Sequence, residues 1–391
     1  MQQASPTARR RTYVVGCDVK PDIRVFSGST YHLAKQGVED GLLTGMMNLY
    51  PRGIGGWRVF ARAGLWKLSG GLRGRHGFKF TNGYLDGIWT HGLPALRDSI
   101  VINNFQLFGS HFLQSHTTFG IEPYFYIDGT LCEYFGDYRA FDTAKIDETT
   151  MRQALTVERE GYASCRKIVV MSKRTAVNIA ERYDVPPRKI HIVPPGANIP
   201  ERLLEMLESR PARFYQPGKE TFVVGFIGVY PARKGLPTIA EAVRLLRRSG
   251  YNIRLHVIGK CPPEIAQRDG IVNFGLIDKS VDMDRFIEIV RNVDVGCMLS
   301  RAELTGISLL EFLRIGVPII ATDVGGIPDI VELGAGHLVS PQISADDLAQ
   351  RLARLIDQPD QMAELKQSAW RRRHNASWRR AVQELKGVLN R

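Results

Sequence analysis

The stretch DVGCMLSRAELTGISLLEFLRIGVPIIATD, residues 294–323, decides the fold of the second half of the chain. A short apolar run is followed by a polar loop, then by apolar residues at helical spacing, and then by a second apolar run. This order is typical of two buried parallel strands joined through a helix. The stretch therefore predicts a strand over 294–300, a helix over 306–316 and a strand over 317–323.

The same alternation continues on both sides of this unit. In the second half we expect further strands at 221–228, 253–259, 271–275 and 336–340, and helices at 236–250, 282–293, 326–333 and 344–357. In the first half we expect strands at 12–19, 99–105, 123–128, 167–172 and 189–198, and a helix at 173–183 with Ser172 as its N-cap. Strands that alternate with helices form parallel sheets covered on both faces. The predicted fold is therefore α/β, with two doubly wound, Rossmann-like domains facing across a cleft.

The chain is long enough to need both domains. Its 391 residues are more than a domain with a single hydrophobic core usually contains. The segment from about 199 to 220 is polar and interrupted by prolines, which is typical of an inter-domain connection. We expect an acceptor-binding domain over 1–200, a donor-binding domain over 201–375, and a C-terminal helix over 376–391 that packs back toward the first domain.

Composition indicates a globular protein. Apolar residues make up 44% of the chain and charged residues 24%, and the longest apolar runs are too short to cross a bilayer. The N-terminus has no apolar core of signal-peptide length. The five cysteines are far apart and form no CxxC, so we expect neither a zinc site nor a disulfide framework, and a cytoplasmic setting fits.

The net charge of +12 is spread unevenly, and the stretch between Asp40 and Asp86 contains no acidic residue. Aromatic and aliphatic residues are interleaved there with cations; the set is Arg52, Trp57, Arg58, Phe60, Arg62, Leu65, Trp66, Lys67, Arg73, Arg75 and Lys79. Residues 50–80 are therefore either a solvated basic loop region or a surface for peripheral contact with an anionic membrane. No nucleic-acid recognition motif accompanies the charge, so we expect no nucleic acid partner.

Glu303 and Glu311 flank the start of the predicted helix 306–316. Glu303 lies at the carboxyl end of a strand, where ligands of such folds bind. The first N–H groups of the helix have no intrahelical partner and suit a diphosphate, and Gly306 allows close approach of the ligand. Glu303 can then bind the hydroxyls of a sugar, and Glu311 those of a ribose. The stretch therefore predicts a nucleotide-sugar site.

A second stretch, GVYPARKG at 228–235, follows the first strand of the second half. Arg233 and Lys234 come just before a helix at the same edge of the predicted sheet. Two cations held there would stabilise a leaving diphosphate as negative charge develops on it.

In this order, the two stretches resemble the retaining glycosyltransferases of family 4, which have the GT-B fold. The matching residues are Glu303, Glu311, Lys234-Gly235, Gly316-Val317-Pro318 and Gly325-Gly326-Ile327-Pro328, and VPPRKIHIVPPGANIP at 185–200 resembles the close of the first domain. The resemblance covers about 165–391 and is weak before that. It implies that Glu303 holds the transferred sugar and Glu311 the ribose. It also implies that no metal or other cofactor is needed and that the diphosphate meets Arg233, Lys234, Thr305, Gly306, Ile307 and Ser308.

The first domain matches the family pattern less well. The family often has His at a strand end there, and no secure equivalent is found. Asp128 is the expected catalytic candidate, and further options are Asn103, Asn104, His91, His111 and His116. The resemblance also assigns Gly28 and Ser29 to the loop that approaches donor phosphate or acceptor. Val229 stands where the family often has Arg, and Arg233 is expected to take that role.

The predicted activity is transfer of a sugar from a nucleotide-diphosphate donor to a hydroxyl of a glycan or lipid-linked acceptor, at the inner face of the membrane. A nucleotide-sugar epimerase on the same fold and a non-enzymatic membrane-docking or sugar-binding scaffold remain open. A phosphorylase would need a lysine for pyridoxal phosphate, and the helix bearing Glu311 has none. A dinucleotide dehydrogenase would need GxGxxG after a strand, and that spacing is absent.

Overall fold

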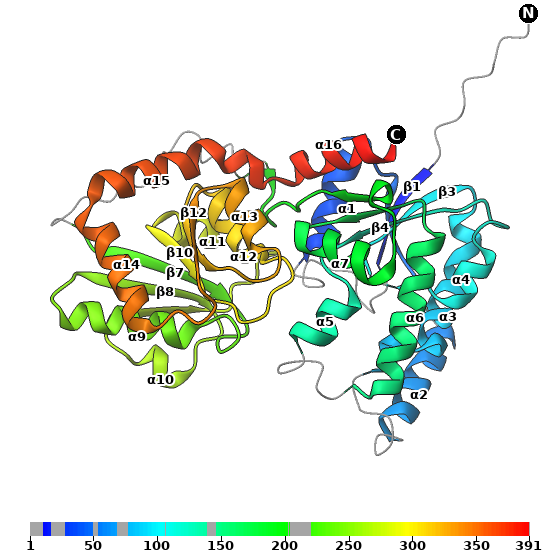
Figure 1. Cartoon of the computed structure of the whole chain (residues 1–391), viewed down its shortest axis with the longest axis horizontal. Helices are drawn as coiled ribbons and strands as arrows, with labels where there is room; N and C mark the ends of the chain where they lie inside the picture. The colour runs from blue at the N-terminus through cyan, green and yellow to red at the C-terminus, as the bar shows by residue number, and fades with distance from the viewer. Residues whose placement is uncertain are drawn as a thin grey trace, which may run out of the picture. The chain divides into compact units, whose positions relative to one another are not determined.

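The computed structural model describes residues 11–16, 28–49, 54–68, 77–105, 107–138, 146–201, 203 and 220–390. The chain divides into two compact units, one formed by Met1–Val193 with Val382–Arg391 and the other by Pro194–Ala381 (Figure 1). Most of the expected connection between domains, 204–219, lies outside the described residues.

The first unit is built on a six-stranded parallel sheet with the strand order β2-β1-β3-β4-β5-β6. The strands are β1 (Arg11–Gly16), β2 (Gly45–Asn48), β3 (Ser99–Asn103), β4 (Glu122–Ile127), β5 (Lys167–Val170) and β6 (Ile190–Ile192). All five expected strands of this half are present, although the end of the first one, 17–19, lies outside the described residues. The sequence missed β2, because its four residues GMMN contain no β-branched residue and no alternation.

Helices cover this sheet on both faces. They are α1 (Ser29–Glu39), α2 (Ile54–Leu68), α3 (Asn82–Gly92), α4 (Ser110–Ser115), α5 (Leu131–Asp137), α6 (Glu148–Ser164) and α7 (Lys173–Tyr183). Ser172 caps α7 as expected, because its hydroxyl accepts a hydrogen bond from the N–H of Thr175 at 3.2 Å. The interpretation of residues 50–80 as a loop region is wrong for 54–68, which form α2.

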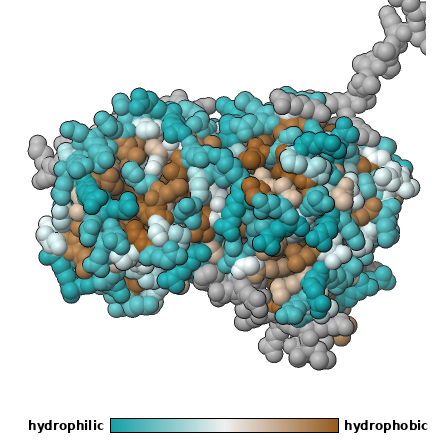
Figure 2. Space-filling view, in the orientation of Figure 1, coloured by the Kyte–Doolittle hydropathy of each residue, from teal (hydrophilic) through white to brown (hydrophobic). Residues whose placement is uncertain are grey.

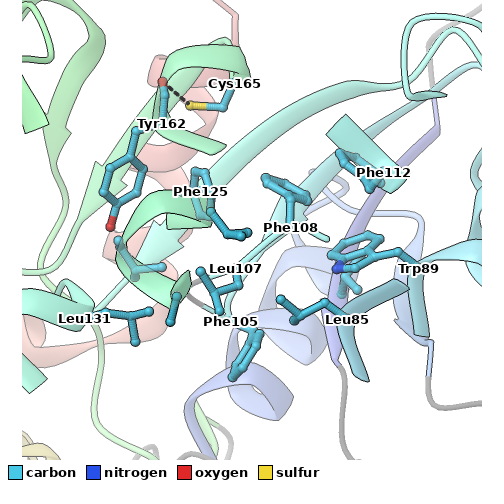
Figure 3. Close-up of a cluster of buried hydrophobic side chains, with 14 of the residues drawn as sticks. Leu85, Trp89, Phe105, Leu107, Phe108, Phe112, Phe125, Leu131, Tyr162 and Cys165 are labelled. Atoms are coloured by element: carbon cyan, nitrogen blue, oxygen red, sulfur yellow. Dashed lines mark hydrogen bonds between the residues drawn. The ribbon is translucent and has the colours of Figure 1, made fainter. Parts of the chain in front are cut away.

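An aromatic cluster fills the core of the first unit between the sheet and helices α3, α4 and α6. Figure 3 shows Trp89, Phe108, Phe112 and Phe125 turned toward one another. The ring centroids of Phe108 and Phe112 are 4.4 Å apart, and those of Trp89 and Phe112 are 4.5 Å apart. Burial of such large rings supplies much of the hydrophobic stabilisation of a domain.

The second unit contains another six-stranded parallel sheet, with the order β12-β11-β10-β7-β8-β9. The strands are β7 (Phe222–Gly228), β8 (Ile253–Gly259), β9 (Ile271–Gly275), β10 (Val295–Met298), β11 (Ile319–Thr322) and β12 (Gly336–Val339), and all were expected. β7 pairs with β8 on one side and with β10 on the other. The loops that follow β7 and β10 therefore leave the sheet next to each other, at the point where the strand order reverses.

Helices also cover both faces of the second sheet. They are α9 (Leu236–Arg248), α10 (Pro263–Ala266), α11 (Met283–Arg291), α12 (Ile307–Arg314), α13 (Ile327–Leu333), α14 (Ala345–Asp357) and α15 (Pro359–Arg372). The last helix, α16 (Trp378–Leu389), begins in the second unit, and its residues from Val382 onward belong to the first unit. One core lies under α9 and α14, and the other under α11, α12 and α13. Helix α15 was not expected from the sequence. It is attached to the sheet by a buried ion pair in which Lys366 Nζ lies 2.8 Å from Asp294 Oδ1.

Hydrophilic residues predominate on the face of the molecule seen in Figure 2, and apolar residues show between them. Within the described residues, none of the helices combines the length and the apolarity needed to cross a bilayer.

Candidate active site

The N-terminus of helix α12 is open to a ligand. The helix begins at Ile307, and its N-cap residue, Gly306, has φ 89° and ψ 52°. Among the described residues no side chain caps this end. The N–H groups of Ile307 and Ser308 are therefore available to an anion, as the sequence predicts. Glycine suits the N-cap position because other residues rarely adopt this left-handed conformation.

Glu303 lies beside that helix end and meets both predicted cations. Its Oε2 atom is 3.2 Å from Arg233 Nη1 and 3.7 Å from Lys234 Nζ. The Oγ hydroxyl of Ser300 is 3.4 Å from the same oxygen. The side chain of Glu303 is 12% exposed, so its carboxylate is largely shielded from water. The structure thus brings three of the predicted site residues together.

Lys234 connects the carboxylate to the helix end. Its Nζ lies 3.3 Å from the hydroxyl of Ser308, the second residue of α12. Burial lowers the pKa of Lys234, and the neighbouring Glu303 carboxylate opposes that effect. An ammonium that is held in a poorly solvated place interacts strongly with any anion that enters.

Backbone hydrogen bonds join the loop after β7 to the loop after β10. The N–H of Leu299 donates to the carbonyl of Lys234 at 3.1 Å, and the N–H of Arg301 donates to the carbonyl of Arg233 at 2.9 Å. Gly235 permits this contact, because a Cβ atom there would lie 2.6 Å from the carbonyl oxygen of Leu299. The two cations are therefore held next to Glu303 by the main chain itself.

The predicted Gly-Gly-Ile-Pro turn supports the same loop from the other side. Gly325 has φ 58°, and a Cβ atom there would lie only 1.6 Å from the carbonyl oxygen of Glu303. The N–H of Gly326 donates to the carbonyl of Leu304 at 2.9 Å. Glycine is required at 325 because no side chain fits between the two backbones.

Glu311 lies on the second turn of α12 and is almost completely buried, with 1% of its surface exposed. Its Oε1 atom is 2.5 Å from Lys279 Nζ. Lys279 belongs to the loop between β9 and α11 and was not predicted to be part of the site. The sequence offered one signal, which is that this loop follows a strand of the same parallel sheet.

The predicted residues Gly28 and Ser29 of the first unit lie at the start of α1, and Asn103, Asn104 and Asp128 lie at the carboxyl ends of β3 and β4. Gly28 is the N-cap residue of α1, with φ 87°, and Ser29 is the first residue of that helix and is 6% exposed. The hydroxyl of Thr30 donates to the side-chain carbonyl of Asn104, whose amide group donates to the carbonyl of Tyr126. These bonds attach the start of α1 to the ends of β3 and β4.

Asp128 follows β4 directly and is half-buried. Its carbonyl oxygen accepts a hydrogen bond from the Thr175 hydroxyl at 3.3 Å. Asn103, an alternative, binds its own turn, because its amide group donates to the carbonyl of Leu107 at 2.9 Å and its oxygen accepts from the N–H of Phe105.

The three histidine alternatives make local contacts in the first unit. His91 Nδ1 lies 3.1 Å from the carbonyl oxygen of Gly87, one turn earlier in α3. His116 Nδ1 lies 3.0 Å from the carbonyl oxygen of Leu113, at the end of α4. His111 is exposed on α4.

Comparison with known proteins finds a family model that matches much of the second unit. Residues 211–372 match the family model described as glycosyl transferases group 1. The 2-deoxystreptamine glucosyltransferase of Streptomyces kanamyceticus is 27% identical over 240 residues, which are 58% of this chain and 60% of that protein. The structure of Anabaena HepE in complex with UDP-glucose is similar with a TM-score of 0.62 at 14% identity, over 97% of this chain and 99% of that chain. Sucrose-phosphate synthase from Thermosynechococcus elongatus has a TM-score of 0.64 at 16% identity, over 98% of both chains.

The similarities differ in what they cover. The chain spans about three fifths of the length of the glucosyltransferase, whereas the two structures match almost the whole chain at low identity. The matched family model lies entirely within the second unit, and it includes Glu303, Glu311, Arg233 and Lys234. Residues 211–372 therefore match a domain of the glycosyl transferases group 1 type, and the two parallel six-stranded sheets have the GT-B fold.

Proposed function

We propose that the chain is a retaining glycosyltransferase of family 4, which moves a sugar from a nucleotide-diphosphate donor to a hydroxyl of a glycan or lipid-linked acceptor. The main support is the pairing of Glu303 with Arg233 and Lys234 beside the open start of α12. A carboxylate suits the hydroxyls of a sugar, and cations with free amides suit a diphosphate. These groups are the ones that a nucleotide sugar requires, in one place.

Transfer breaks the bond between the anomeric carbon of the sugar and the diphosphate, and negative charge develops on the leaving oxygen. Arg233, Lys234 and the amides of α12 stabilise that charge. Glu303 then exchanges its ion pairs for hydrogen bonds from the sugar hydroxyls. These groups supply the positive charge that a metal ion would otherwise supply, so we propose that the transfer needs no metal and no other cofactor.

We assign the acceptor to the first unit. The acceptor hydroxyl attacks the anomeric carbon from the side on which the diphosphate leaves and passes its proton to the leaving phosphate oxygen, and this geometry retains the anomeric configuration. Asp128 is the candidate there to orient the hydroxyl, because it is half-buried at the end of a central strand. Gly28 and Ser29, at the start of α1, are the candidates to approach the donor phosphate or the acceptor.

The test begins with binding. UDP, GDP and ADP are titrated into the protein by calorimetry. Nucleotide sugars that carry the same base as the best-binding nucleoside diphosphate are then used in a transfer assay. Glu303→Gln is expected to reduce transfer by about 100-fold or more, as for the loss of a group that acts in the transition state. The same variant is expected to bind the nucleoside diphosphate at least as well as the parent does, because Arg233 and Lys234 lose their competing carboxylate.

Glu364→Gln, an exposed change on α15, is the matched control and is expected to leave both quantities unchanged. Full transfer by Glu303→Gln would contradict the assignment. An epimerase would convert the sugar nucleotide without an acceptor, and a scaffold would bind no nucleoside diphosphate, so the same assays separate these alternatives.

We also propose that α2 contacts the surface of an anionic membrane, so that the protein acts peripherally at the inner face of that membrane. Trp57, Phe60, Leu65 and Leu68 are 74%, 68%, 66% and 86% exposed. Their spacing places them on one face of the helix. Large apolar side chains gathered on one exposed helix face are typical of interfacial helices.

The rest of α2 supports this orientation. Val59 is 5% exposed, and Trp66 packs against Phe78 with ring centroids 6.1 Å apart, so the opposite face is turned toward the first unit. Arg58 and Arg62 are exposed near the apolar face. With no acidic residue between positions 40 and 86, the cations complement an anionic headgroup layer.

Vesicle co-sedimentation tests the membrane contact. The parent is expected to bind vesicles of mixed anionic and zwitterionic lipid, and to be released as salt rises through the screening range. The variants Phe60→Ser with Leu65→Ser, and Arg58→Gln with Arg62→Gln, are each expected to bind less. Val177→Ser, which changes an exposed apolar residue on α7, is the control. Equal sedimentation of parent and variants would exclude α2 as the contact.

A further inference from the structure

Lys279 belongs to no sequence motif, and yet it makes the ion pair of Glu311. We propose that Lys279 is a positioning and specificity residue of the donor site, which holds the Glu311 carboxylate toward the ribose hydroxyls and so makes the site prefer ribonucleotides over deoxyribonucleotides. The proposal rests on the proposed function, because it assigns the ribose of the donor to Glu311.

The two side chains differ in exposure. The Glu311 side chain is 2% exposed and that of Lys279 is 25% exposed, while Nζ and Oε1 are 2.5 Å apart. A carboxylate buried this deeply needs a charged partner, because desolvation of an unpaired charge is costly. Lys279 is that partner, and its side chain is the more exposed of the two.

The loop that carries Lys279 is held by its own hydrogen bonds. The Oδ1 atom of Asp278 accepts from the N–H of Ser280 at 3.0 Å and from its hydroxyl at 2.5 Å. The carbonyl of Asp278 accepts from the N–H groups of Val281 and Asp282 at 3.0 and 2.9 Å. The main chain on both sides of Lys279 is thus part of a closed turn that leads into α11.

The far end of the lysine is also held. Its Nζ atom lies 4.3 Å from the centroid of the Phe286 ring, and that ring is fully buried. A cation at this distance from an aromatic ring is attracted to its face. The ammonium is therefore fixed by the ring and by Glu311 together. Because the backbone of Lys279 is held by its turn and its ammonium by these two contacts, the side chain can orient the Glu311 carboxylate.

Lys279 and Glu311 belong to the same charged cluster as the diphosphate cations. Both influence the pKa of Lys234, which burial lowers, Glu311 raises and Lys279 lowers further. The cluster contains three cations, Arg233, Lys234 and Lys279, and two carboxylates, Glu303 and Glu311. Lys279 balances the charge of Glu311, which leaves Arg233 and Lys234 as the cations for a diphosphate.

Glu311 keeps hydrogen-bonding capacity for a ligand. A carboxylate has about four acceptor positions on its two oxygens. Lys279 uses Oε1, and Oε2 has no hydrogen-bond partner within the described part of the chain. Two ribose hydroxyls can donate to the remaining positions while Lys279 stays in place. A site built to bind a hydroxyl discriminates strongly against an analogue without it.

The experiment measures this discrimination directly. UDP, GDP and ADP, each with its 2′-deoxy counterpart, are titrated by calorimetry into the parent and into Lys279→Met. For the base that binds, the parent is expected to prefer the ribonucleotide by about tenfold or more, which is the effect of one hydrogen bond to a charged group. Lys279→Met is expected to bind the ribonucleotide about tenfold more weakly and the deoxynucleotide almost as before, so that the preference is lost.

Two further variants control for general effects. Lys279→Arg keeps the positive charge and is expected to retain most of the preference. Arg285→Met removes a cation six residues away, whose ion pair is with half-exposed Asp282 at 3.7 Å, and is expected to behave as the parent. Thermal unfolding of each variant is measured in parallel, and the affinities are compared at a temperature where all variants are folded.

The outcomes separate this proposal from the proposed function. If the parent binds nucleoside diphosphates and Lys279→Met keeps both the affinity and the preference, the role of Lys279 is overturned and the donor site stands. If Lys279→Met binds the ribonucleotide more tightly than the parent does, Lys279 competes with the ribose and the proposal is again overturned. If no nucleoside diphosphate binds the parent, both proposals fall.

Discussion

Replacing Lys234 with methionine tests the donor site closely, because methionine has nearly the same length and shape and carries no charge. In the structure Nζ lies 3.7 Å from Glu303 Oε2 and 3.3 Å from Ser308 Oγ. The side chain is 12% exposed. The ammonium therefore stands between the acid and the start of α12, where we expect the leaving diphosphate to gain charge.

The expected loss follows from this geometry. Removal of one donor to a developing oxyanion costs about 2.7–4 kcal/mol in the transition state, so kcat/KM should fall by about 100- to 1000-fold. The stability of the folded protein should not fall together with the activity. Burial lowers the pKa of Lys234, which means that the folded protein solvates this ammonium less well than water does. Arg233 remains 3.2 Å from Glu303, so the free energy of unfolding is expected to stay the same or rise slightly.

The assay is steady-state sugar transfer at saturating acceptor, with thermal unfolding measured on the same preparations. Arg351→Met, which removes an exposed cation on α14, is the control. An unchanged kcat/KM for Lys234→Met would refute the assigned role. A fall in unfolding free energy as large as the fall in activity would also refute the reasoning, because it would make Lys234 a residue of stability rather than of the reaction.

Three further predictions concern stability. Gly325→Ala would place a Cβ atom 1.6 Å from the carbonyl oxygen of Glu303. Both Tm and sugar transfer should therefore fall, and the free energy of unfolding in urea should drop by about 1–3 kcal/mol. An unaltered Tm would show that the turn can move. Lys366→Met leaves the fully buried Asp294 without its cation and should lower the free energy of unfolding in urea by about 3–5 kcal/mol. A change smaller than the experimental error would mean that the pair is dispensable. Burial raises the pKa of Glu158 to about 8 from 4.5. Between these values the unfolded chain binds fewer protons than the folded protein does, so the unfolding free energy should fall with rising pH, by up to about 1.4 kcal/mol per pH unit. Glu158→Gln should remove that slope, and an identical slope in both proteins would assign it to other groups.

The second half of the molecule was predictable because its signals are local. The apolar runs of β7 and β10 and the helical spacing of α12 are each contained in fewer than ten residues. Parallel strands bring their carboxyl ends to one edge of the sheet, so Glu303 and Lys234 could be expected to meet although 69 positions separate them. The observed ion pair follows from that rule.

The first half was less predictable, for physical reasons that can be named. β2 has four residues and no alternation, and α2 contains three glycines, which are poor helix formers. The buried carboxylate of Glu158 receives hydrogen bonds from the hydroxyls of Tyr162 and Tyr183. A tyrosine 25 positions away gives no signal of that contact in the sequence.

By itself the sequence determined the alternation of strands and helices, the sheet edge at which Glu303, Arg233 and Lys234 lie and the residue types gathered there, because all of these depend on short-range patterns. Tertiary structure alone decided which atoms meet. It paired Lys279 with Glu311, exposed the apolar face of α2 and brought Gly325 against the backbone of Glu303. These features depend on segments that are distant along the chain. They exist only after the packing of the whole domain has fixed where each segment lies.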